Sequence, residues 1–311
     1  EKQYGYRNKV EFSFAVNPNQ LIALGFFNRG GKVRRPITGT LLAEPVINEA
    51  AQYILTWINE KQIPIRSLKS LIVRSNHKSE AMAALFVKDQ LTFSDYPELT
   101  DKLLGFHLYY STHKSPASVP TKLLYSAGQN YLIAELLGTK LKYGLLSFFQ
   151  VNIPMFEQAL QDMAAFIGPK QPIVDYYSGV GAISLPLARN RLETKLVDNN
   201  EEAIIYAKEN IARNDLTNCE AQCLPAEDIT ELIDSEKIIV LDPPRAGLHQ
   251  KMILKLLAKK PPRIVYLSCD LSTQARDIGL LGEAYKVSFL KLYNFFPRTP
   301  HIEGLCVLDR V

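Results

Sequence analysis

The 311-residue chain contains four cysteines, and none of them lies in the paired spacing that is typical of a zinc site. No signal peptide is recognisable, and no apolar run is long enough to cross a membrane. A chain of this size without a secretion signal gives no reason to expect disulfides, so we expect a reducing, cytoplasmic setting. Because the first residue is Glu1 rather than methionine, these expectations concern only the residues shown.

Charge is distributed unevenly along the chain. The net charge is +4, but residues 1–140 carry 17 Lys and Arg against 11 Asp and Glu, whereas residues 141–311 carry 19 against 21. A basic first domain suits a polyanionic partner, although an ordinary solvated surface accounts for this excess about as often. With 47% hydrophobic residues the chain can bury a full core, and we expect a monomer with two domains.

Residues 1–140 predict an α+β domain with mostly antiparallel strands. Alternating apolar residues at 10–16 and 21–27 flank an Asn-Pro-Asn turn, which is typical of a hairpin. Residues 45–60 have helical spacing. Further short strands are predicted at 68–73, 81–87, 105–110 and 131–136.

Residues 141–311 change to an alternation of strand, turn and helix. Strands are predicted at 172–175, 196–198, 238–242 and 264–269, and helices at about 182–190, 201–213, 248–259 and 272–282. This alternation is typical of right-handed βαβ units with helices on both faces of a parallel sheet. We therefore predict a Rossmann-like domain with a mostly parallel sheet, and a domain boundary near residue 140.

Three acidic residues are predicted to meet at one edge of this sheet. Asp175 begins a turn that contains Gly179 and Gly181, and Asp198 and Asp242 end later strands. Ligands of open α/β sheets bind beyond the carboxyl ends of the strands, where glycine allows close approach to the backbone. Clustered carboxylates would repel a pyrophosphate, so a sulfonium cofactor with an amino group and a ribose, S-adenosylmethionine, fits better than a dinucleotide.

Cys269 ends the fourth predicted strand at the same edge. This position offers a thiol to the crevice, although a cysteine after an apolar strand is about as often a small buried hydrophobic residue. The other three cysteines keep that second interpretation.

Five sequence blocks, in this order, resemble the RNA uracil-5 methyltransferases, which make 5-methyluridine in transfer or ribosomal RNA. The blocks are Phe148-Phe149-Gln150-Val151-Asn152, Asp175-Tyr176-Tyr177-Ser178-Gly179-Val180-Gly181, Asp242-Pro243-Pro244-Arg245-Ala246-Gly247, Ser268-Cys269-Asp270-Leu271-Ser272-Thr273 and Phe296-Pro297-Arg298-Thr299-Pro300-His301-Ile302-Glu303. They cover the second domain.

The resemblance implies a covalent methyl transfer. Cys269 matches the thiolate that adds to carbon 6 of uracil, and Glu303 matches the base that removes the proton from carbon 5. The positions that match the cofactor site are Gln150, Tyr177, Gly179, Asp198 and Asp242. Arg245, Thr273 and His301 match positioning groups, and Arg298 is a candidate phosphate contact.

Two departures from the family pattern matter. Asp270-Leu271 follows the cysteine where the family usually has a proline, and Glu44-Pro45-Val46 occupies the position of the fourth cysteine of an iron–sulfur cluster. We therefore expect no iron–sulfur cluster. The oligonucleotide-binding barrel that often precedes these domains is not visible in the sequence.

The RNA partner is expected to present its uridine in a loop or flipped out of a helix. Aromatic and basic residues near the N-terminus are the contact candidates, with a solvated hairpin as the alternative: Tyr4, Tyr6, Arg7, Lys9, Arg29, Lys32, Arg34 and Arg35. The sequence does not choose between transfer and ribosomal RNA. An RNA cytosine-5 or nitrogen methyltransferase, or an RNA-binding module without turnover, stays open as an alternative.

Overall fold

The computed structural model of the protein describes residues 2–28, 30–31, 33–113, 118–168, 171–189, 191–225, 228 and 230–311. The chain divides into two compact units, Glu1–Leu132 and Ile133–Val311, and each is described by itself. Within the described ranges, no helix combines the length and apolarity that a membrane crossing requires.

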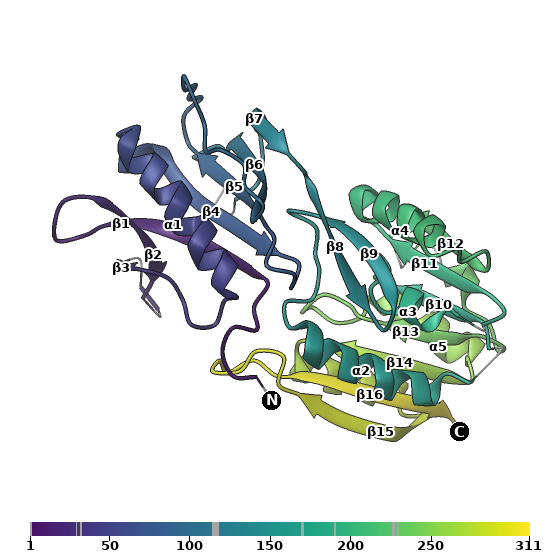
Figure 1. Ribbon diagram of the computed structural model, residues 1–311. Helices are drawn as coiled ribbons and strands as arrows, with labels where there is room; N and C mark the ends of the chain where they lie inside the picture. The colour runs from purple at the N-terminus through teal and green to yellow at the C-terminus, as the bar shows by residue number, and fades with distance from the viewer. Residues whose placement is uncertain are drawn as a thin grey trace. The chain divides into compact units, whose positions relative to one another are not determined.

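The first unit contains a seven-stranded sheet (Figure 1). Its strands are β1 (Lys9–Val16), β2 (Ile22–Phe27), β3 (Arg34–Ile37), β4 (Leu68–Ser75), β5 (Ala81–Val87), β6 (Leu103–Tyr110) and β7 (Lys122–Gly128). They lie in the order β3-β2-β1-β4-β5-β6-β7, and every neighbouring pair is antiparallel except β5 with β6. The predicted antiparallel α+β domain and its first hairpin are thus confirmed.

Helix α1 (Pro45–Glu60) packs on this sheet against β2, β4 and β5. Proline suits the first turn of a helix, where its missing N–H costs nothing. The helix buries one apolar face, and Trp57 near its end contacts the rings of Phe93 and Phe106. The short 3₁₀ helix η1 (Ile65–Ser67) leads from α1 into β4. The helix predicted at residues 45–60 is confirmed with the same bounds.

Strands β8 (Tyr131–Leu136) and β9 (Thr139–Gly144) form a separate two-stranded sheet. Helix α4 (Glu201–Arg213) holds β9 through side-chain amides. The Asn210 and Asn214 amides accept hydrogen bonds from the backbone N–H groups of Lys142 and Lys140, at 2.6 and 2.9 Å. These bonds fix β9 to α4 within the second unit.

The second unit is built on another seven-stranded sheet, in the order β12-β11-β10-β13-β14-β16-β15. Its strands are β10 (Ile173–Tyr176), β11 (Thr194–Asp198), β12 (Cys219–Cys223), β13 (Ile238–Leu241), β14 (Arg263–Ser268), β15 (Tyr285–Tyr293) and β16 (Glu303–Arg310). The first five in spatial order are parallel, while β16 is antiparallel to both β14 and β15. The predicted Rossmann-like, mostly parallel domain is confirmed.

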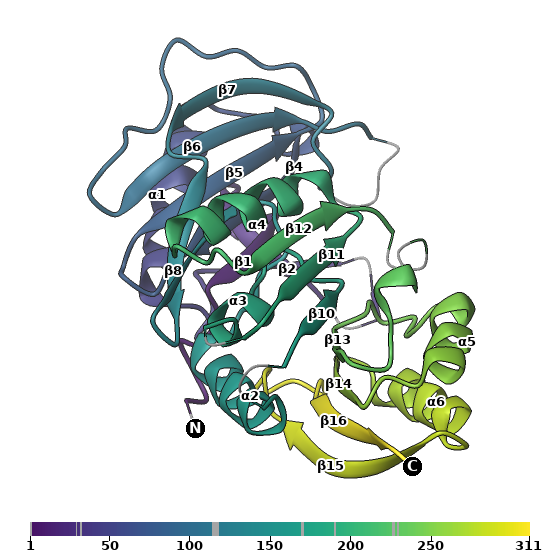
Figure 2. The same ribbon diagram turned by 90° about the vertical axis from the view of Figure 1, so that its right-hand side faces the viewer.

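Helices cover both faces of this sheet. Besides α4, they are α2 (Ile153–Phe166), α3 (Ser184–Leu187), α5 (Gln250–Lys259) and α6 (Leu271–Leu281), with a 3₁₀ turn η3 at Thr230–Leu232. In Figure 2, α2, α3 and α4 lie on one side of the sheet, and α5 and α6 lie on the other. The buried strands β10, β13 and β14 between these two layers form the core of the unit.

The structure differs from the sequence prediction in two ways here. The helix expected at 182–190 is only the four-residue α3. The turn after β10 extends to the residue before Ser184, so the first residues of the expected helix belong to the turn. Gly179 and Gly181 in this turn have positive φ angles, which are incompatible with a helix. The sequence prediction also omitted α2, β12, β15 and β16, and β16 begins with the predicted site residue Glu303.

Candidate active site

Several predicted residues lie at one edge of the second sheet. The parallel strands β11, β13 and β14 bring Asp198, Asp242 and Cys269 to their carboxyl ends. Strand β16 runs the other way, so its first residue, Glu303, lies at the same edge. Because ligands of such sheets bind beyond the carboxyl ends of the strands, this edge is the candidate active site.

Cys269 and Glu303 are close neighbours across two strands. Ser268, the last residue of β14, pairs with Gly304 of β16, so Cys269 directly after β14 and Glu303 at the start of β16 both lie just beyond this pair. The Glu303 carboxylate is close enough to act electrostatically on the Cys269 thiol. The strand register therefore places a thiol beside a carboxyl group.

The surroundings of Cys269 favour its neutral form. The residue is half-buried. Burial raises the pKa of the thiol above its ordinary value, and the nearby Glu303 and Asp242 carboxylates add to the rise. The guanidinium of Arg245 has the opposite effect on that pKa. Four groups from two strands and one loop thus interact electrostatically at this edge.

Both carboxyl groups of the site have raised pKa values. Glu303 is 4% exposed, and burial raises its pKa to about 7. Burial, and after it the charge of Glu303, hold the pKa of Asp242 well above its ordinary value. A carboxyl group with a pKa near neutrality can both accept and release a proton under physiological conditions.

Burial of Glu303 has a cost for stability that depends on pH. Its pKa is about 7 in the folded protein and 4.5 as the ordinary value. Its contribution to stability is therefore full below about pH 4.5 and is lost as the pH rises through 7. We expect Glu303→Gln to raise the free energy of unfolding at pH 8 by up to a few kcal/mol, and so to raise the Tm. At pH 4.5 both quantities should change little. Thermal unfolding at the two pH values tests this, and an equal Tm change at both would contradict it.

Asp270 organises the chain directly after Cys269. Its carboxylate accepts hydrogen bonds from the backbone N–H groups of Ser272 and Thr273, at 3.0 and 3.2 Å, and so caps the start of α6. The hydroxyl of Ser268 donates to the Asp270 carbonyl at 3.0 Å. The cap thus orders this turn at the position where the sequence departs from the proline pattern of the family.

The glycine-containing turn after β10 is joined to the end of β11. The Asp198 carboxylate accepts the backbone N–H of Gly179 and of Asn200, both at 2.8 Å. At Gly179, with φ +55°, the space that a Cβ would occupy is open, whereas a Cβ on Gly181 would lie 2.5 Å from Leu185. Gly181 is therefore needed for packing, while Gly179 leaves room for a ligand to approach the backbone.

Asp175 differs from the other two acidic residues of the predicted cluster. It is completely buried in β10. Burial raises its pKa to about 7, with Ser184 opposing the rise and Asp242 and Asp198 adding to it. The three carboxyl groups are thus electrostatically coupled, but the side chain of Asp175 is enclosed in the protein and is not exposed at the edge.

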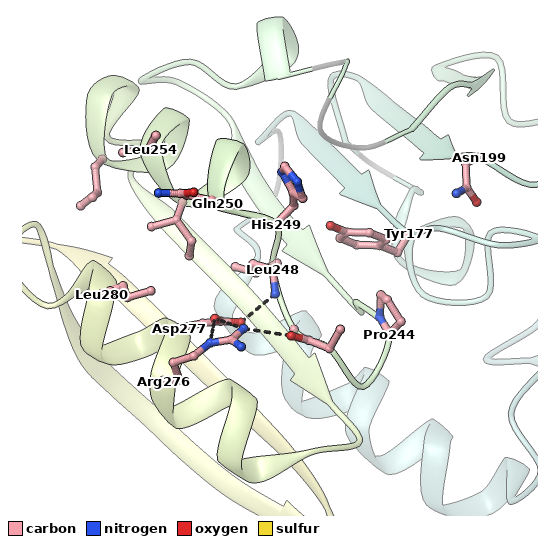
Figure 3. A pocket seen from close by; sticks show the side chains of 14 residues that line it. Tyr177, Asn199, Pro244, Leu248, His249, Gln250, Leu254, Arg276, Asp277 and Leu280 are labelled. Atoms are coloured by element: carbon pink, nitrogen blue, oxygen red, sulfur yellow. Dashed lines mark hydrogen bonds and ion pairs between the residues drawn. The ribbon is translucent and has the colours of Figure 1, made fainter.

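Two cavities meet at Tyr177, whose φ angle is +64°. The smaller, of about 30 Å³, is lined by Gln150, Gly179 and Asp242 among others. The larger, of about 750 Å³, extends from Tyr177 and Asn199 toward α5 and α6 (Figure 3). The set of groups fits S-adenosylmethionine: an open backbone at Gly179, acids for a ribose and an ammonium, and an aromatic ring between the two cavities.

The block that contains Gln150 leads into α2. Gln150 is 5% exposed, and Phe149 stacks on Tyr143 with ring centroids 4.1 Å apart. Asn152 caps α2, and its side chain donates to the Phe295 carbonyl at 3.1 Å. This last bond ties the block to the segment that runs from β15 toward Glu303.

Arg298 and His301 lie in that segment between β15 and β16. Both are exposed, and Arg298 has a φ angle of +68°. The ring of His301 packs edge-on against Phe296, with centroids 6.1 Å apart. The segment therefore presents a cation at the surface a few residues before Glu303.

The other RNA-contact candidates lie in the first unit. Arg34 and Arg35 of β3 are exposed, and Arg7 is half-buried. The prediction for Tyr6 is wrong, because its side chain is 1% exposed and cannot stack on a nucleotide. Tyr4 remains 46% exposed and Lys9 is half-buried. Arg29 and Lys32 lie outside the described residues.

The sequence analysis missed the residues that support the site from α6. Gln274 is 2% exposed and donates to the carbonyls of Tyr266 in β14 and Gly304 in β16, at 3.0 and 2.9 Å. Asp277, one turn later, is completely buried. A polar pair at positions i and i+3 on the apolar face of a helix was the available signal.

The strand order and the groups at the strand ends define the class of the protein: it is an S-adenosylmethionine-dependent methyltransferase. The family profile described as tRNA (Uracil-5-)-methyltransferase matches residues 129–311. The chain belongs to this family, and the resemblance inferred from the sequence is confirmed.

Individual relatives agree with the family assignment. An uncharacterized RNA methyltransferase of Caldanaerobacter subterraneus subsp. tengcongensis is 32% identical over 336 residues, which cover 99% of this chain and 73% of that protein. One of Clostridium tetani is 31% identical over 338 residues, with the same coverage. The crystal structure of the Pyrococcus abyssi tRNA (uracil-54, C5)-methyltransferase in complex with S-adenosyl-L-homocysteine superposes with a TM-score of 0.84 at 25% identity, covering 99% of this chain and 76% of that one.

Proposed function

We propose that the protein transfers a methyl group from S-adenosylmethionine to carbon 5 of a uridine in transfer or ribosomal RNA through a transient Cys269–uracil bond. The observation that carries this proposal is the placement of Cys269 opposite Glu303 at the end of β14, with Asp242 and Arg245 within electrostatic reach. Uracil carbon 5 is a poor nucleophile, and a thiol beside a base supplies the two groups that this chemistry needs.

In this mechanism the Cys269 thiolate adds to carbon 6 of the uracil, and the electron pair of the 5,6 double bond moves toward carbon 5. The bound cofactor supplies the methyl group, which carbon 5 takes up. Glu303 then removes the proton from carbon 5, the double bond re-forms and the carbon–sulfur bond breaks. With its pKa raised to about 7, Glu303 is suited to take that proton at physiological pH.

The cofactor would be held by residues on either side of the two cavities. We assign the ribose to Asp198 and the adenosine to Tyr177, with Gly179 giving the ligand access to the backbone. Gln150 and Asp242 line the same small cavity and would lie between the cofactor and the target base. The burial of Gln150 supports a fixed position for its amide.

RNA would be bound in part through basic residues of the first unit. The Arg34 guanidinium lies 5.0 Å from the ring centroid of Phe27, which is 55% exposed. Both residues line a cavity of about 370 Å³ together with Lys69. Such a combination of aromatic surface and cations is typical of single-stranded RNA sites. Arg7, Arg35 and Arg298 are the other proposed contacts.

We expect the double variant Arg34→Ala, Arg35→Ala to bind RNA more weakly and with less salt dependence. Each lost phosphate contact lowers the slope of log K against log salt by about 1, so the slope should fall by about 2. Fluorescence anisotropy with a labelled RNA at several salt concentrations measures this. Arg66→Ala, an exposed cation of η1, is the matched control. An unchanged slope in the double variant would remove these two residues from the RNA site.

Release of tritium from RNA that carries [5-³H]uridine tests the proposed function itself. Methylation at carbon 5 must release the label, whereas a nitrogen methyltransferase or an RNA-binding module would not release it. RNA labelled at cytosine carbon 5 distinguishes a cytosine enzyme, which the Asp242-Pro243-Pro244 block makes unattractive because it lacks a cysteine. Mapping 5-methyluridine in RNA from cells with and without the protein would identify the RNA and the nucleotide.

Three further expectations from the sequence remain proposals. Monomeric action and a cytoplasmic location are two of them. The third is that no iron–sulfur cluster is bound. It is supported by the surroundings of Glu44, which is 7% exposed, accepts the Ser75 hydroxyl at 2.5 Å and pairs with His77. Metal analysis of the purified protein tests this third expectation.

A further inference from the structure

We propose that Asp277 of α6 is a positioning residue, which fixes the loop of residues 242–248 against the strand that carries Cys269. The proposal rests on the function proposed above, because it is this loop that supplies Asp242 and Arg245 to the site. Asp277 does not reach the site edge itself. It acts through the loop, which it and Arg276 contact at Leu248 and Ala246.

The Asp277 carboxylate joins two elements that are separate in the sequence. One of its oxygens, Oδ2, accepts the backbone N–H of Leu248 at 2.8 Å and the Tyr266 hydroxyl at 2.9 Å. Leu248 ends the loop, and Tyr266 lies in β14, three residues before Cys269. A single buried oxygen atom therefore sets the distance between the loop and the strand.

Arg276 provides a second connection to the same loop. Its Nε and Nη2 atoms donate to the other Asp277 oxygen, Oδ1, at 2.9 and 2.7 Å. Nη2 also donates to the Ala246 carbonyl at 2.9 Å. Figure 3 shows these bonds at the wall of the large cavity, where the two side chains of α6 meet the loop. The Asp277 carboxylate thus has four donors, which a buried charge requires.

Gly247 lets the loop approach α6 this closely. Its φ angle is +78°, a region that favours glycine. A Cβ at this position would lie 2.5 Å from Arg276 Nη2 and 2.6 Å from Asp277 Oδ2. The loop is therefore packed onto the ion pair without spare room, and it can shift only if these contacts break.

An ion pair with one buried partner is by itself weak evidence of a stabilising role, because apolar residues of similar size often stabilise a fold as well. Here Asp277 bonds to the backbone N–H of Leu248 and to the Tyr266 hydroxyl of β14, and Arg276 bonds to the Ala246 carbonyl, so the pair joins the loop to the strand. The neighbouring Gln274 holds β14 and β16 in the same way. Asp277 and Gln274 of α6 thus hold the segments that carry Cys269, Glu303 and Asp242.

The test compares Asp277→Asn with Asp309→Asn. Asp309 of β16 pairs with Arg263 of β14 at 2.5 Å, at the opposite end of β14 from Cys269. Both variants lose an ion pair, and we expect both to unfold at a lower temperature. Only Asp277→Asn should accelerate amide hydrogen exchange in the peptide 242–248. Its affinity for S-adenosyl-L-homocysteine, measured by calorimetry, should fall about tenfold, and its methylation rate on the order of 10- to 100-fold.

A second variant keeps the test informative if Asp277→Asn does not fold. Arg276→Met removes the half-exposed cation with its bonds to Ala246 and to Asp277 Oδ1, but it keeps the bonds of Asp277 Oδ2 to Leu248 and Tyr266, so it should give the same changes at smaller amplitude. The proposal would be overturned if the Asp277 and Asp309 variants had the same rate of amide hydrogen exchange in the peptide 242–248 and the same affinity for S-adenosyl-L-homocysteine. If the loop loosens in Asp277→Asn but Asp242→Asn binds the cofactor normally, the positioning role stands and the proposed role of Asp242 is wrong.

Discussion

Replacing Cys269 with serine or alanine is expected to abolish methylation. Loss of an enzyme's nucleophile can lower kcat by a factor on the order of 10⁶, and a serine hydroxyl does not replace a thiolate in addition to carbon 6 of uracil. The variant should still fold and bind cofactor, because Cys269 is half-buried and lies beyond the last paired residue of β14, Ser268. Incorporation of methyl label into RNA measures the loss.

Cys223→Ala is the matched control for this experiment. Cys223 is the exposed cysteine at the end of β12, and its removal should leave methylation unchanged. RNA that contains 5-fluorouridine should form a denaturation-resistant complex with the wild-type protein and none with Cys269→Ala. Full methylation by the Cys269 variants would refute the covalent mechanism, whatever the protein binds.

Glu303→Gln is expected to trap the RNA on the protein. The thiol can still add and carbon 5 can still accept the methyl group, but the proton on carbon 5 then has no base to take it. Removing a general base typically costs about 10²–10⁴-fold, so the covalent complex should accumulate while product formation slows by that factor. A band that survives denaturing electrophoresis, with labelled methyl groups in it, is the measurement.

Glu283→Gln, an exposed acid outside the site, serves as the control and should trap nothing. The double variant Glu303→Gln, Cys269→Ala should also trap nothing, because the trapped species requires the thiol. Wild-type turnover should rise as the pH increases through about 7, since Glu303 must be ionised to accept the proton. A Glu303→Gln protein that folds, binds RNA and releases product at the normal rate would exclude Glu303 as the base.

The sequence predicted those parts of the fold that depend on local patterns. Helices α1 and α4 have the predicted bounds because Pro45 and the Asn200 cap mark their starts and one face of each is apolar. The meeting of Asp198, Asp242 and Cys269 at one edge was also predictable, because all parallel strands of a βαβ unit end on the same side.

What the sequence could not supply depends on pairing between distant segments. Nothing local to β16 shows that it lies beside β14, so the neighbourhood of Cys269 and Glu303 came from the family resemblance and only the strand register gave it a geometry. Asp277 was missed because one of its partners is the backbone N–H of Leu248, which leaves no mark in a sequence. Tyr6 was misjudged because interleaved aromatic and basic residues do not show which of the side chains are buried.

The position of β16 between β14 and β15 has a consequence for how the enzyme is made. During synthesis β14 and β15 leave the ribosome before β16, so the nascent chain holds the thiol before it holds the base. Under the proposed mechanism, a chain at that stage would carry the nucleophile without the base and could not complete a methyl transfer. Insertion of β16 between β14 and β15 would then be the last step in assembling the proposed site.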